Sequence, residues 1–391
     1  MKPRIVEPVG VGAFTFYPLQ EAASRLRHTA ARRAVRARTA ALQLATERGP
    51  VLNYGRLNQP AGSSELPIGG QIKLIPLRAK FPEHYDRFNI IYLVSSALPP
   101  HAEEIVTAAK RQGARLVWNQ NGIAYPGCYG DYYAWFNLRM AGLRAQADYI
   151  FNQSEFSRLS AERYLGPSAA PSEICLNPVD TRTFSPAEAA LPREPWQILA
   201  AGTSHAIYRT KSVLDTIRAL LKRGHKVHLT IAGEFRWRNA SAQVAREMEG
   251  IRDHVTILPP FRQSEAPDIY RRAHVLLHTK FNDPCPTVPI EAMACGVPVV
   301  GTHSGGMPEL VSSGSGNLVP VPGSWTQDLA GDPQSLAGAI EEVMEDHVRY
   351  SHAARDHAIR TFDVEWWLAR HAEIFHTLAR GDRPNDAPSR P

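Results

Sequence analysis

Short apolar runs rich in β-branched residues alternate with helix-length segments along most of the chain. The alternation is typical of parallel β-sheets, because a parallel strand pair needs a long crossover connection, usually a helix. It therefore predicts an α/β fold. The predicted strands are VLNYG from residue 51, IKLIPL from 72, NIIYLVS from 89, ARLVW from 114 and DYIFN from 148 in the first half, and WQILAAG from 196, HKVHLTIAG from 225, HVTIL from 254, HVLLH from 274, VPVVG from 297 and NLVPV from 317 in the second.

The two sets of strands indicate two doubly wound, Rossmann-like domains. Between them, NPVDTRTFSP at 177–186 carries two prolines and no apolar periodicity, so we place the domain boundary there. A last pattern, FDVEWWLARHAEIFHTLARG, concentrates apolar residues on one helical face, which predicts a packed helix. The predicted parts are a basic helical N-terminal arm at 1–50, Rossmann-like domains at 51–186 and 187–361, a C-terminal helix at 362–380 and a disordered tail at 381–391.

Composition favours a protein that does not span a membrane. A hydrophobic fraction of 43% with 21% charged residues is ordinary for a globular chain. Its four cysteines form no C-x-x-C pair, which favours a reducing cytoplasm. The N-terminus lacks the apolar core of a signal peptide, and the longest strongly apolar run, IIYLV from Ile90, is far too short for a membrane span. We expect a cytoplasmic location.

The positive charge of the chain is concentrated in its first 48 residues. They hold nine basic and three acidic side chains, 9 − 3 = +6, so everything from Gly49 onward balances to zero. No nucleic-acid-binding motif accompanies these charges, so we expect no nucleic-acid partner. Two interpretations stay open: a solvated helix packed on the next domain, or peripheral attraction to anionic lipids at the inner face of the membrane.

The stretch FNDPCPTVPIEAMACGVPVVGTHSGGMPELV, residues 281–311, contains the clearest candidate site. Asp283 and Glu291 stand eight positions apart, and between them Thr287 is predicted to be the N-cap of a short helix that ends at Gly296. Prolines have no N–H group. The backbone donors left at the positive end of this helix, where they could bind a phosphate, are Cys285, Thr287 and Val288.

A second cluster of polar residues follows the strand WQILAAG. Its loop, TSHAIYRTKSV, offers Arg209 and Lys211 just before a helix expected to start near Ser212. Ligands of open α/β sheets bind beyond the carboxyl ends of the strands, where the loops holding Thr287 and Gly305 also emerge. Two cations and a helix N-terminus could neutralise a diphosphate without a metal ion, and the chain contains no Asp-x-Asp triplet. We expect no metal site.

Asp283 and Glu291, with the IEAMACGVPVV core, resemble the E-x7-E segment of the family 4 glycosyltransferases, which are retaining sugar-transfer enzymes of the GT-B fold. The resemblance spans roughly residues 60–380. It implies two Rossmann-like domains that face each other across a cleft, the first binding the acceptor and the second a nucleotide sugar. It also implies that the C-terminal helix crosses back to the first domain.

The resemblance assigns roles to individual residues. It implies that Lys211, assisted by Arg209, grips the diphosphate, that Glu291 holds the nucleotide ribose, and that Asp283 contacts the donor sugar. It also places the nucleotide base beside the turn LPPF, which contains Phe261. The other donor-binding positions that we predict are the backbone donors Cys285, Thr287 and Val288 and the glycine turn Gly305 and Gly306.

On the acceptor side, the resemblance points to two loops of the first domain. Asn121 and Gly122 fall where many family members have a His followed by Gly or Asp, and Gly69 and Gly70 resemble the glycine turn near the phosphates and the acceptor. Two further departures concern the donor side. Asp283 replaces the first Glu, and Thr203 stands where an Arg is common, for which Arg209 could substitute.

These residues predict a metal-independent, retaining glycosyltransferase that moves a hexose-type sugar from a nucleoside-diphosphate sugar to a glycan, lipid-linked or small-molecule acceptor. The nucleotide sugar is a co-substrate, and no cofactor is expected. Two alternatives stay open: a sugar-nucleotide epimerase of the same fold, which would need acids and bases in its site, and a non-catalytic protein that binds a nucleotide sugar or a glycan.

Overall fold

The computed structural model describes residues 35, 37–57 and 69–384, which form two compact units. Residues 1–34 and 36 of the predicted arm lie outside the described residues, and so do residues 385–391 of the predicted tail. Unit 1 comprises Tyr125–Gly130 and Asn177–Val364 of the described chain, and unit 2 comprises the rest. The chain therefore passes from one unit to the other at Asn177 and after Val364, and also on both sides of a six-residue segment of the first half.

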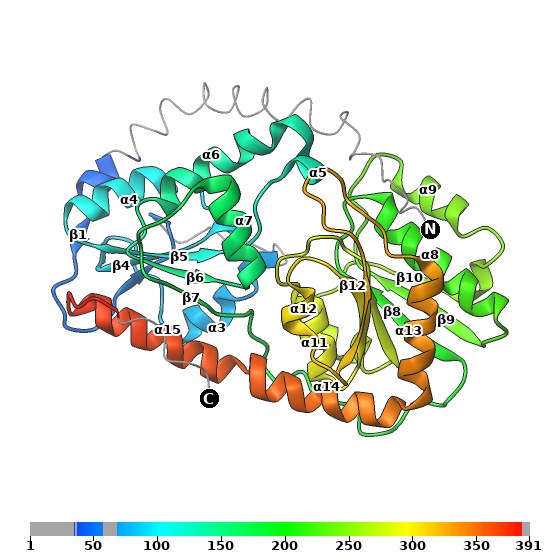
Figure 1. The fold of residues 1–391 in the computed structure, drawn as a ribbon. Helices are drawn as coiled ribbons and strands as arrows, with labels where there is room; N and C mark the ends of the chain where they lie inside the picture. The colour runs from blue at the N-terminus through cyan, green and yellow to red at the C-terminus, as the bar shows by residue number, and fades with distance from the viewer. Residues whose placement is uncertain (1–34, 36, 58–68, 385–391) are drawn as a thin grey trace. The chain divides into compact units, whose positions relative to one another are not determined.

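Unit 1 is built on a six-stranded parallel sheet with the order β10-β9-β8-β11-β12-β13 (Figure 1). All six strands predicted for this half are confirmed. Their bounds are β8 Trp196–Ala201, β9 Val227–Ala232, β10 Val255–Leu258, β11 Val275–His278, β12 Val299–His303 and β13 Gly316–Pro320. Strand order reverses between β8 and β11, which makes the carboxyl ends of these two strands the expected ligand position of a doubly wound sheet.

Helices cover both faces of this sheet, which explains why every residue of β11 and all but the last residue of β12 are buried. One face packs on α8, α9 and α13, through a core that includes Leu214, Leu229 and Ile340. On the other, α11 packs on α14 and α10 (Figure 1). The helices are α5 Pro126–Tyr129, α8 Ile207–Lys222, α9 Ala240–Glu247, α10 Ala266–Tyr270, α11 Thr287–Ala294, α12 Met307–Leu310, α13 Pro333–Glu345 and α14 His347–Phe362, with the 3-10 helix η5 Arg252–His254.

Unit 2 contains a five-stranded parallel sheet with the order β2-β4-β5-β6-β7 and a separate pair, β1-β3. Its strands are β1 Gln43–Leu44, β2 Leu52–Asn53, β3 Arg87–Phe88, β4 Ile90–Val94, β5 Arg115–Gln120, β6 Tyr149–Asn152 and β7 Ser172–Ile174. Its helices are η2 Gly69–Gln71, α3 Leu74–Lys80, η3 Ser95–Ala97, α4 Ala102–Arg111, η4 Gly130–Tyr132, which starts in unit 1, α6 Tyr133–Arg144, α7 Glu155–Leu165 and α15 Val364–Ala379.

The strand predicted at IKLIPL is wrong, because Leu74–Lys80 forms helix α3. Leu74 and Leu77 are buried while Ile75 is half exposed, a spacing of three that suits a helix and not a strand. Pro76 is tolerated because it lies in the first turn, where N–H groups have no partner within the helix.

The C-terminal helix α15 belongs to unit 2 from Glu365 onward. Its predicted apolar face is confirmed, since all of its members are buried. His371 stacks on Phe151 with 3.9 Å between ring centroids, and its Nε2 lies 3.1 Å from Tyr92 Oη. Burial lowers the pKa of His371 to about 3, so this imidazole is a neutral packing group. The face comprises Val364, Trp367, Leu368, His371, Ile374, Phe375 and Leu378.

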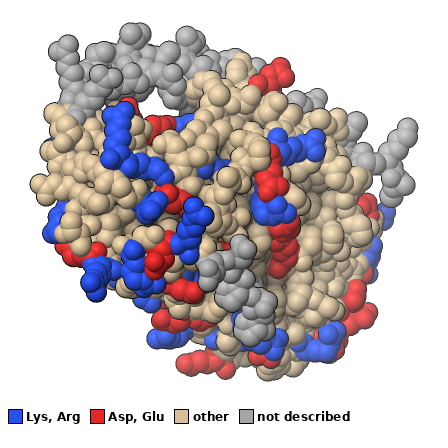
Figure 2. Space-filling view, turned by 60° about the vertical axis from the view of Figure 1, so that its left-hand side comes forward, with Lys and Arg blue, Asp and Glu red and all other residues tan. Residues whose placement is uncertain are grey.

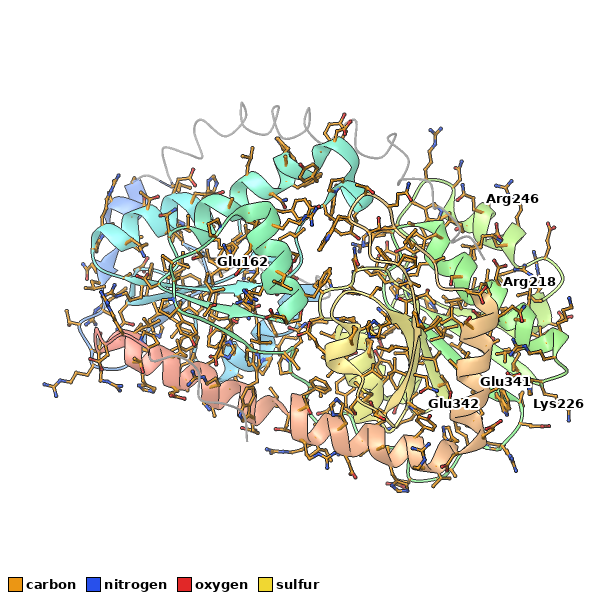
Figure 3. All side chains as sticks on the ribbon, in the orientation of Figure 1. Glu162, Arg218, Lys226, Arg246, Glu341 and Glu342 are labelled. Atoms are coloured by element: carbon orange, nitrogen blue, oxygen red, sulfur yellow. The ribbon has the colours of Figure 1, made fainter. Side chains whose placement is uncertain are left out.

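No helix in the described part of the chain is long and apolar enough to cross a membrane. On the face shown in Figure 2, basic and acidic side chains are interspersed. Several charged residues project from the outer surface of the units, including Arg218, Lys226 and Glu341 (Figure 3). Lys226 lies just before β9, at the amino end of that strand, and pairs with Glu194 at 2.9 Å.

Candidate functional site

The reversal point of the unit 1 sheet brings together the loops after β8 and β11. Arg209, in the first turn of α8, donates from Nη2 to the Ala201 carbonyl at 2.8 Å and from Nη1 to the Thr203 carbonyl at 2.9 Å. Thr279, just beyond β11, donates to the Arg209 carbonyl at 3.0 Å. The Arg209 guanidinium is therefore fixed at the carboxyl end of β8, beside the residue that stands where the family often has an arginine.

Asp283 is the acidic centre of this cluster. Its side chain is buried, and its Oδ2 lies 3.1 Å from Lys280 Nζ and 3.4 Å from His278 Nε2. Burial by itself would raise the pKa of Asp283, but Lys280, His278 and Arg209 outweigh it and hold this pKa below its usual range. Asp283 is thus a carboxylate across the physiological pH range, beside the cations Lys280 and Arg209 and beside His278, whose own pKa is lowered by burial.

The glycine turn after β12 packs directly on the backbone of Asp283. Gly305 has a φ of +62°, and a Cβ placed on it would lie 2.4 Å from the Asp283 carbonyl oxygen. The Gly306 N–H donates to that same oxygen at 2.8 Å. The structure therefore joins two of the predicted loops, and it does so at a contact that only glycine can make.

Helix α11 begins beside these loops, one residue earlier than predicted. Thr287 is the first helical residue and Pro286 occupies the N-cap position without a side-chain cap, so the predicted N-cap role of Thr287 is wrong. The other end is as predicted, since Gly296 follows the C-cap Cys295 with a φ of +72°. Thr287 and Val288 remain partly exposed at the N-terminus of α11, and Val288 lies 3.4 Å from the position of a Cβ on Gly202.

Glu291 lies in the second turn of α11 and is buried. Tyr270 donates to its Oε2 at 2.7 Å and Gln263 to its Oε1 at 2.8 Å. Burial raises the pKa of Glu291 to about 6, against the opposing effect of these two hydrogen bonds. Gln263 belongs to the loop after β10 that also holds Phe261, which is partly exposed. The two donors orient the carboxylate, and each oxygen has a second lone pair.

Lys211 lies in the second turn of α8, because this helix begins at Ile207 and not near Ser212 as predicted. Its Nζ contacts Glu247 Oε2 at 2.8 Å and Asp215 Oδ2 at 3.4 Å. Lys280 lowers the pKa of Asp283 more than any other group does, whereas Lys211 does not contribute to this shift. Lys280 and His278 were missed in the sequence because the family pattern draws attention to Asp283 and not to the preceding strand end.

Residues 125–130 contribute to unit 1 next to the same cluster. Tyr125 donates to Asp328 Oδ1 at 2.7 Å, and the Gly127 N–H donates to the Trp325 carbonyl at 2.9 Å. A Cβ on Gly127 would lie 2.7 Å from the backbone nitrogen of Gln327. Burial raises the pKa of Asp328 to about 6, and Lys280 is among the groups that oppose this rise. No sequence signal pointed to this buried carboxyl.

The four residues predicted for the acceptor side lie in unit 2. Asn121 directly follows β5, and Gly122 comes next in the same loop. Gly69 opens the 3-10 helix η2, and Gly70 packs against the Asn121 side chain, since a Cβ on Gly70 would lie 2.7 Å from Asn121 Nδ2. Gly70 also lies against Ser96, whose Oγ would lie 2.4 Å from that Cβ.

Comparison with known proteins agrees with these features. Residues 196–346 match the family described as Glycosyl transferases group 1. The matched residues lie within unit 1 and include all six strands of its sheet.

Relatives by sequence include a D-inositol 3-phosphate glycosyltransferase of Streptomyces bingchenggensis, 34% identical over 134 residues, which is 34% of this chain and 28% of the relative. A glycogen synthase of Mycobacterium tuberculosis is 29% identical over 233 residues, 56% of this chain and 51% of the relative. The chain thus matches about a quarter to a half of the length of these curated relatives.

Solved structures share the fold. The Anabaena protein Alr3699/HepE in complex with UDP-glucose superposes with a TM-score of 0.63 at 17% identity, over 86% of this chain and all of that one. A sucrose-phosphate synthase of Thermosynechococcus elongatus gives a TM-score of 0.62 at 16% identity, over 84% of this chain and 88% of that one. The predicted fold class, two Rossmann-like domains of the GT-B type, is confirmed.

Proposed function

We propose that the protein is a retaining glycosyltransferase that moves a hexose-type sugar from a nucleoside-diphosphate sugar to an acceptor hydroxyl. The carrying observation is the Arg209, Lys280 and Asp283 cluster at the reversal point of a sheet that belongs to a glycosyl transferase group 1 domain. Relatives described as transferases, and a neighbour of the same fold solved with UDP-glucose, support a sugar nucleotide as the ligand.

In the proposed reaction, the bond between the anomeric carbon and the diphosphate oxygen breaks while a bond to the acceptor oxygen forms on the same face. The acceptor proton passes to a phosphate oxygen of the leaving group, so no protein base is required. Arg209, Lys280 and the N-terminus of α11 stabilise the negative charge that develops on the diphosphate. Glu291 accepts hydrogen bonds from the ribose hydroxyls, and Lys211 leaves Glu247 to reach the diphosphate.

Product stereochemistry and chelation test this proposal. With UDP-glucose, an α-linked donor, the product is expected to be α-linked by NMR coupling, and transfer is expected to survive EDTA because side chains and a helix terminus neutralise the leaving group. A β-linked product would contradict retention. Activity lost in EDTA and restored by magnesium would contradict metal-independent transfer.

A sugar-nucleotide epimerase is the second candidate, favoured by Asp328, whose pKa of about 6 suits an acid that exchanges protons near neutral pH. The assay that separates the two omits the acceptor. An epimerase converts UDP-glucose into its epimer under those conditions, whereas a transferase releases only UDP and glucose slowly. A non-catalytic binding protein does neither.

Peripheral attraction of residues 1–48 to anionic lipid is a separate part of the proposal, supported by their net charge of 9 − 3 = +6. Cosedimentation with vesicles of phosphatidylglycerol and phosphatidylcholine compares the full chain with a chain that begins at Gly49. Only the full chain is expected to pellet, and salt is expected to release it. Equal pelleting of both chains would contradict this role.

A further inference from the structure

Lys73 is a buried lysine at the carboxyl edge of the unit 2 sheet. It precedes α3, directly after the glycine turn, and its side chain is 4% exposed. Its Nζ donates to Asn119 Oδ1 at 2.8 Å, to Asn121 Oδ1 at 2.9 Å and to Gln153 Oε1 at 3.5 Å. One ammonium group thus joins the ends of β5 and β6 through three side-chain amides.

These contacts determine which way the Asn121 amide points. An ammonium group can only donate, so the amide oxygen of Asn121 must face Lys73 and the NH₂ group must face the other way. There, Asn121 Nδ2 donates to Ser96 Oγ at 2.6 Å. An NH₂ group has two hydrogens, and Ser96 is the acceptor that the described residues provide for it.

The backbone of Asn121 is held as firmly as its side chain. The Asn121 N–H donates to Ser95 Oγ at 2.8 Å, and the Ser157 hydroxyl donates to its carbonyl at 2.8 Å. The absence of a side chain on Gly70 leaves room for the Asn121 amide, since a Cβ there would collide with it. The loop therefore holds the buried Asn121 side chain in one orientation, with its NH₂ group beside the exposed Ser96, and Lys73 is the group that fixes that orientation.

We infer that Lys73 is a positioning residue that turns the Asn121 amide NH₂ outward as a hydrogen-bond donor for a neutral oxygen of the acceptor, such as a hydroxyl of a polyol or sugar. The inference rests on the proposed transfer reaction for its substrate class. Asn121 is the group that touches the acceptor, and Lys73 acts only through it.

Two substitutions separate the roles. Asn121→Asp keeps an oxygen facing Lys73 and replaces the NH₂ donor with a second oxygen, which Ser96 can satisfy by donating. Lys73→Met removes the ammonium group at similar length. Both variants are expected to raise the acceptor KM roughly ten- to a hundredfold, as for a hydrogen bond lost in a buried site, while the Kd of UDP stays within about twofold of wild type.

The assay uses UDP-glucose as donor, with D-inositol 3-phosphate and glycogen as acceptor probes. The double variant is expected to be no worse than the poorer single variant, because Lys73 acts through Asn121. The matched control is Lys110→Met, which removes a lysine paired with Asp148 at 2.6 Å, at the amino edge of the same sheet. This control is expected to leave the acceptor KM unchanged.

Crystal structures of the two single variants provide a readout that does not depend on the acceptor. In Lys73→Met the contact between Asn121 Nδ2 and Ser96 Oγ is expected to be lost. A wild-type acceptor KM in folded Lys73→Met, additive losses in the double variant, or an unmoved Asn121 amide would each overturn the inference. Failure of the proposed function looks different, because wild-type protein would then release no UDP from UDP-glucose, with or without an acceptor.

Discussion

The carboxyl edges of the two sheets are both lined with polar groups, but their chemistry differs. In unit 1, the carboxylate of Asp283 is opposed by the cations Arg209 and Lys280, so charge acts on charge. In unit 2, the ammonium of Lys73 is surrounded by side-chain amide oxygens. The comparison teaches that one edge controls ionisation, which suits a diphosphate, and the other controls orientation, which suits a neutral hydroxyl compound.

Arg209→Ala should have the largest effect on activity of the substitutions at the carboxyl edge of the unit 1 sheet, which we call the charged edge. We expect kcat/KM to fall by roughly three orders of magnitude, about 4 kcal/mol, because the variant removes a preorganised cation and leaves Asp283 with less compensation. Arg209→Lys keeps the charge but cannot bond both carbonyls, so it should recover only part of the loss. Thermal melting checks that both variants fold. A kcat/KM near the wild-type value in folded Arg209→Ala would show that Arg209 does not take part in the reaction.

Lys211→Ala tests whether the charged edge extends to the second turn of α8. We expect kcat/KM to fall by roughly two orders of magnitude if Lys211 reaches the diphosphate. Lys226→Ala is the control, since it removes a surface lysine paired with a carboxylate at the amino edge of the sheet. Equal kcat/KM values in the two variants would show that Lys211 only pairs with Glu247 and Asp215 and does not reach the diphosphate.

Glu291→Gln tests, through the pH dependence of UDP binding, whether the Glu291 carboxylate of unit 1 contacts the nucleotide. The pKa of Glu291 is raised to about 6, so the carboxylate is ionised above that pH and becomes protonated below it. UDP binding by wild-type protein should therefore weaken roughly tenfold more than binding by Glu291→Gln as the pH falls from about 7.5 to 5. The phosphate of UDP also titrates near pH 6, but it does so equally in both titrations.

Calorimetry at each pH measures these Kd values. At pH 7.5 the variant should bind UDP more weakly than wild type and melt at nearly the same temperature, because Gln preserves an acceptor for Tyr270. Parallel pH curves would show that Glu291 does not contact the nucleotide. Early unfolding with normal binding would restrict Glu291 to a structural role.

Gly70→Ala should have the smallest effect on the charged edge. The added Cβ would meet Ser96 Oγ at 2.4 Å and Asn121 Nδ2 at 2.7 Å, so it disturbs only the amide groups at the carboxyl edge of the unit 2 sheet. We expect the Kd of UDP to stay within about twofold of wild type while transfer to an acceptor declines. A large loss of UDP binding would show that the two edges are not separate in function.

Sequence reasoning succeeded best in unit 1 because its signals are local. Six strands follow from β-branched runs, and Gly296 and Gly305 occupy backbone conformations that favour glycine. It failed at IKLIPL, because an apolar run of six residues fits a strand or a buried helix turn equally well. The N-cap at Thr287 was misplaced by one residue because Pro286 already has the extended backbone of that position.

The contacts that the sequence could not reveal are long-range. Lys73 meets amides that lie 46, 48 and 80 positions further along the chain, and Tyr125 meets Asp328 across 203 positions. A buried lysine or aspartate carries no local signature, since exposed residues of the same type are far more common. Lys280 was overlooked for a related reason, because a lone cation near a strand end resembles any solvated charge.

The segment Tyr125–Gly130 also sets a rule for recombining this chain with its relatives. A chimera joined at residue 176 would take residues 177–364 from one parent and this segment from the other, although the segment belongs to the same unit as those residues. Gly127 fits against Gln327 without room for a side chain, and Tyr125 covers Asp328. A working exchange must therefore take the segment and residues 321–331 from the same parent, although the two stretches are far apart in the sequence.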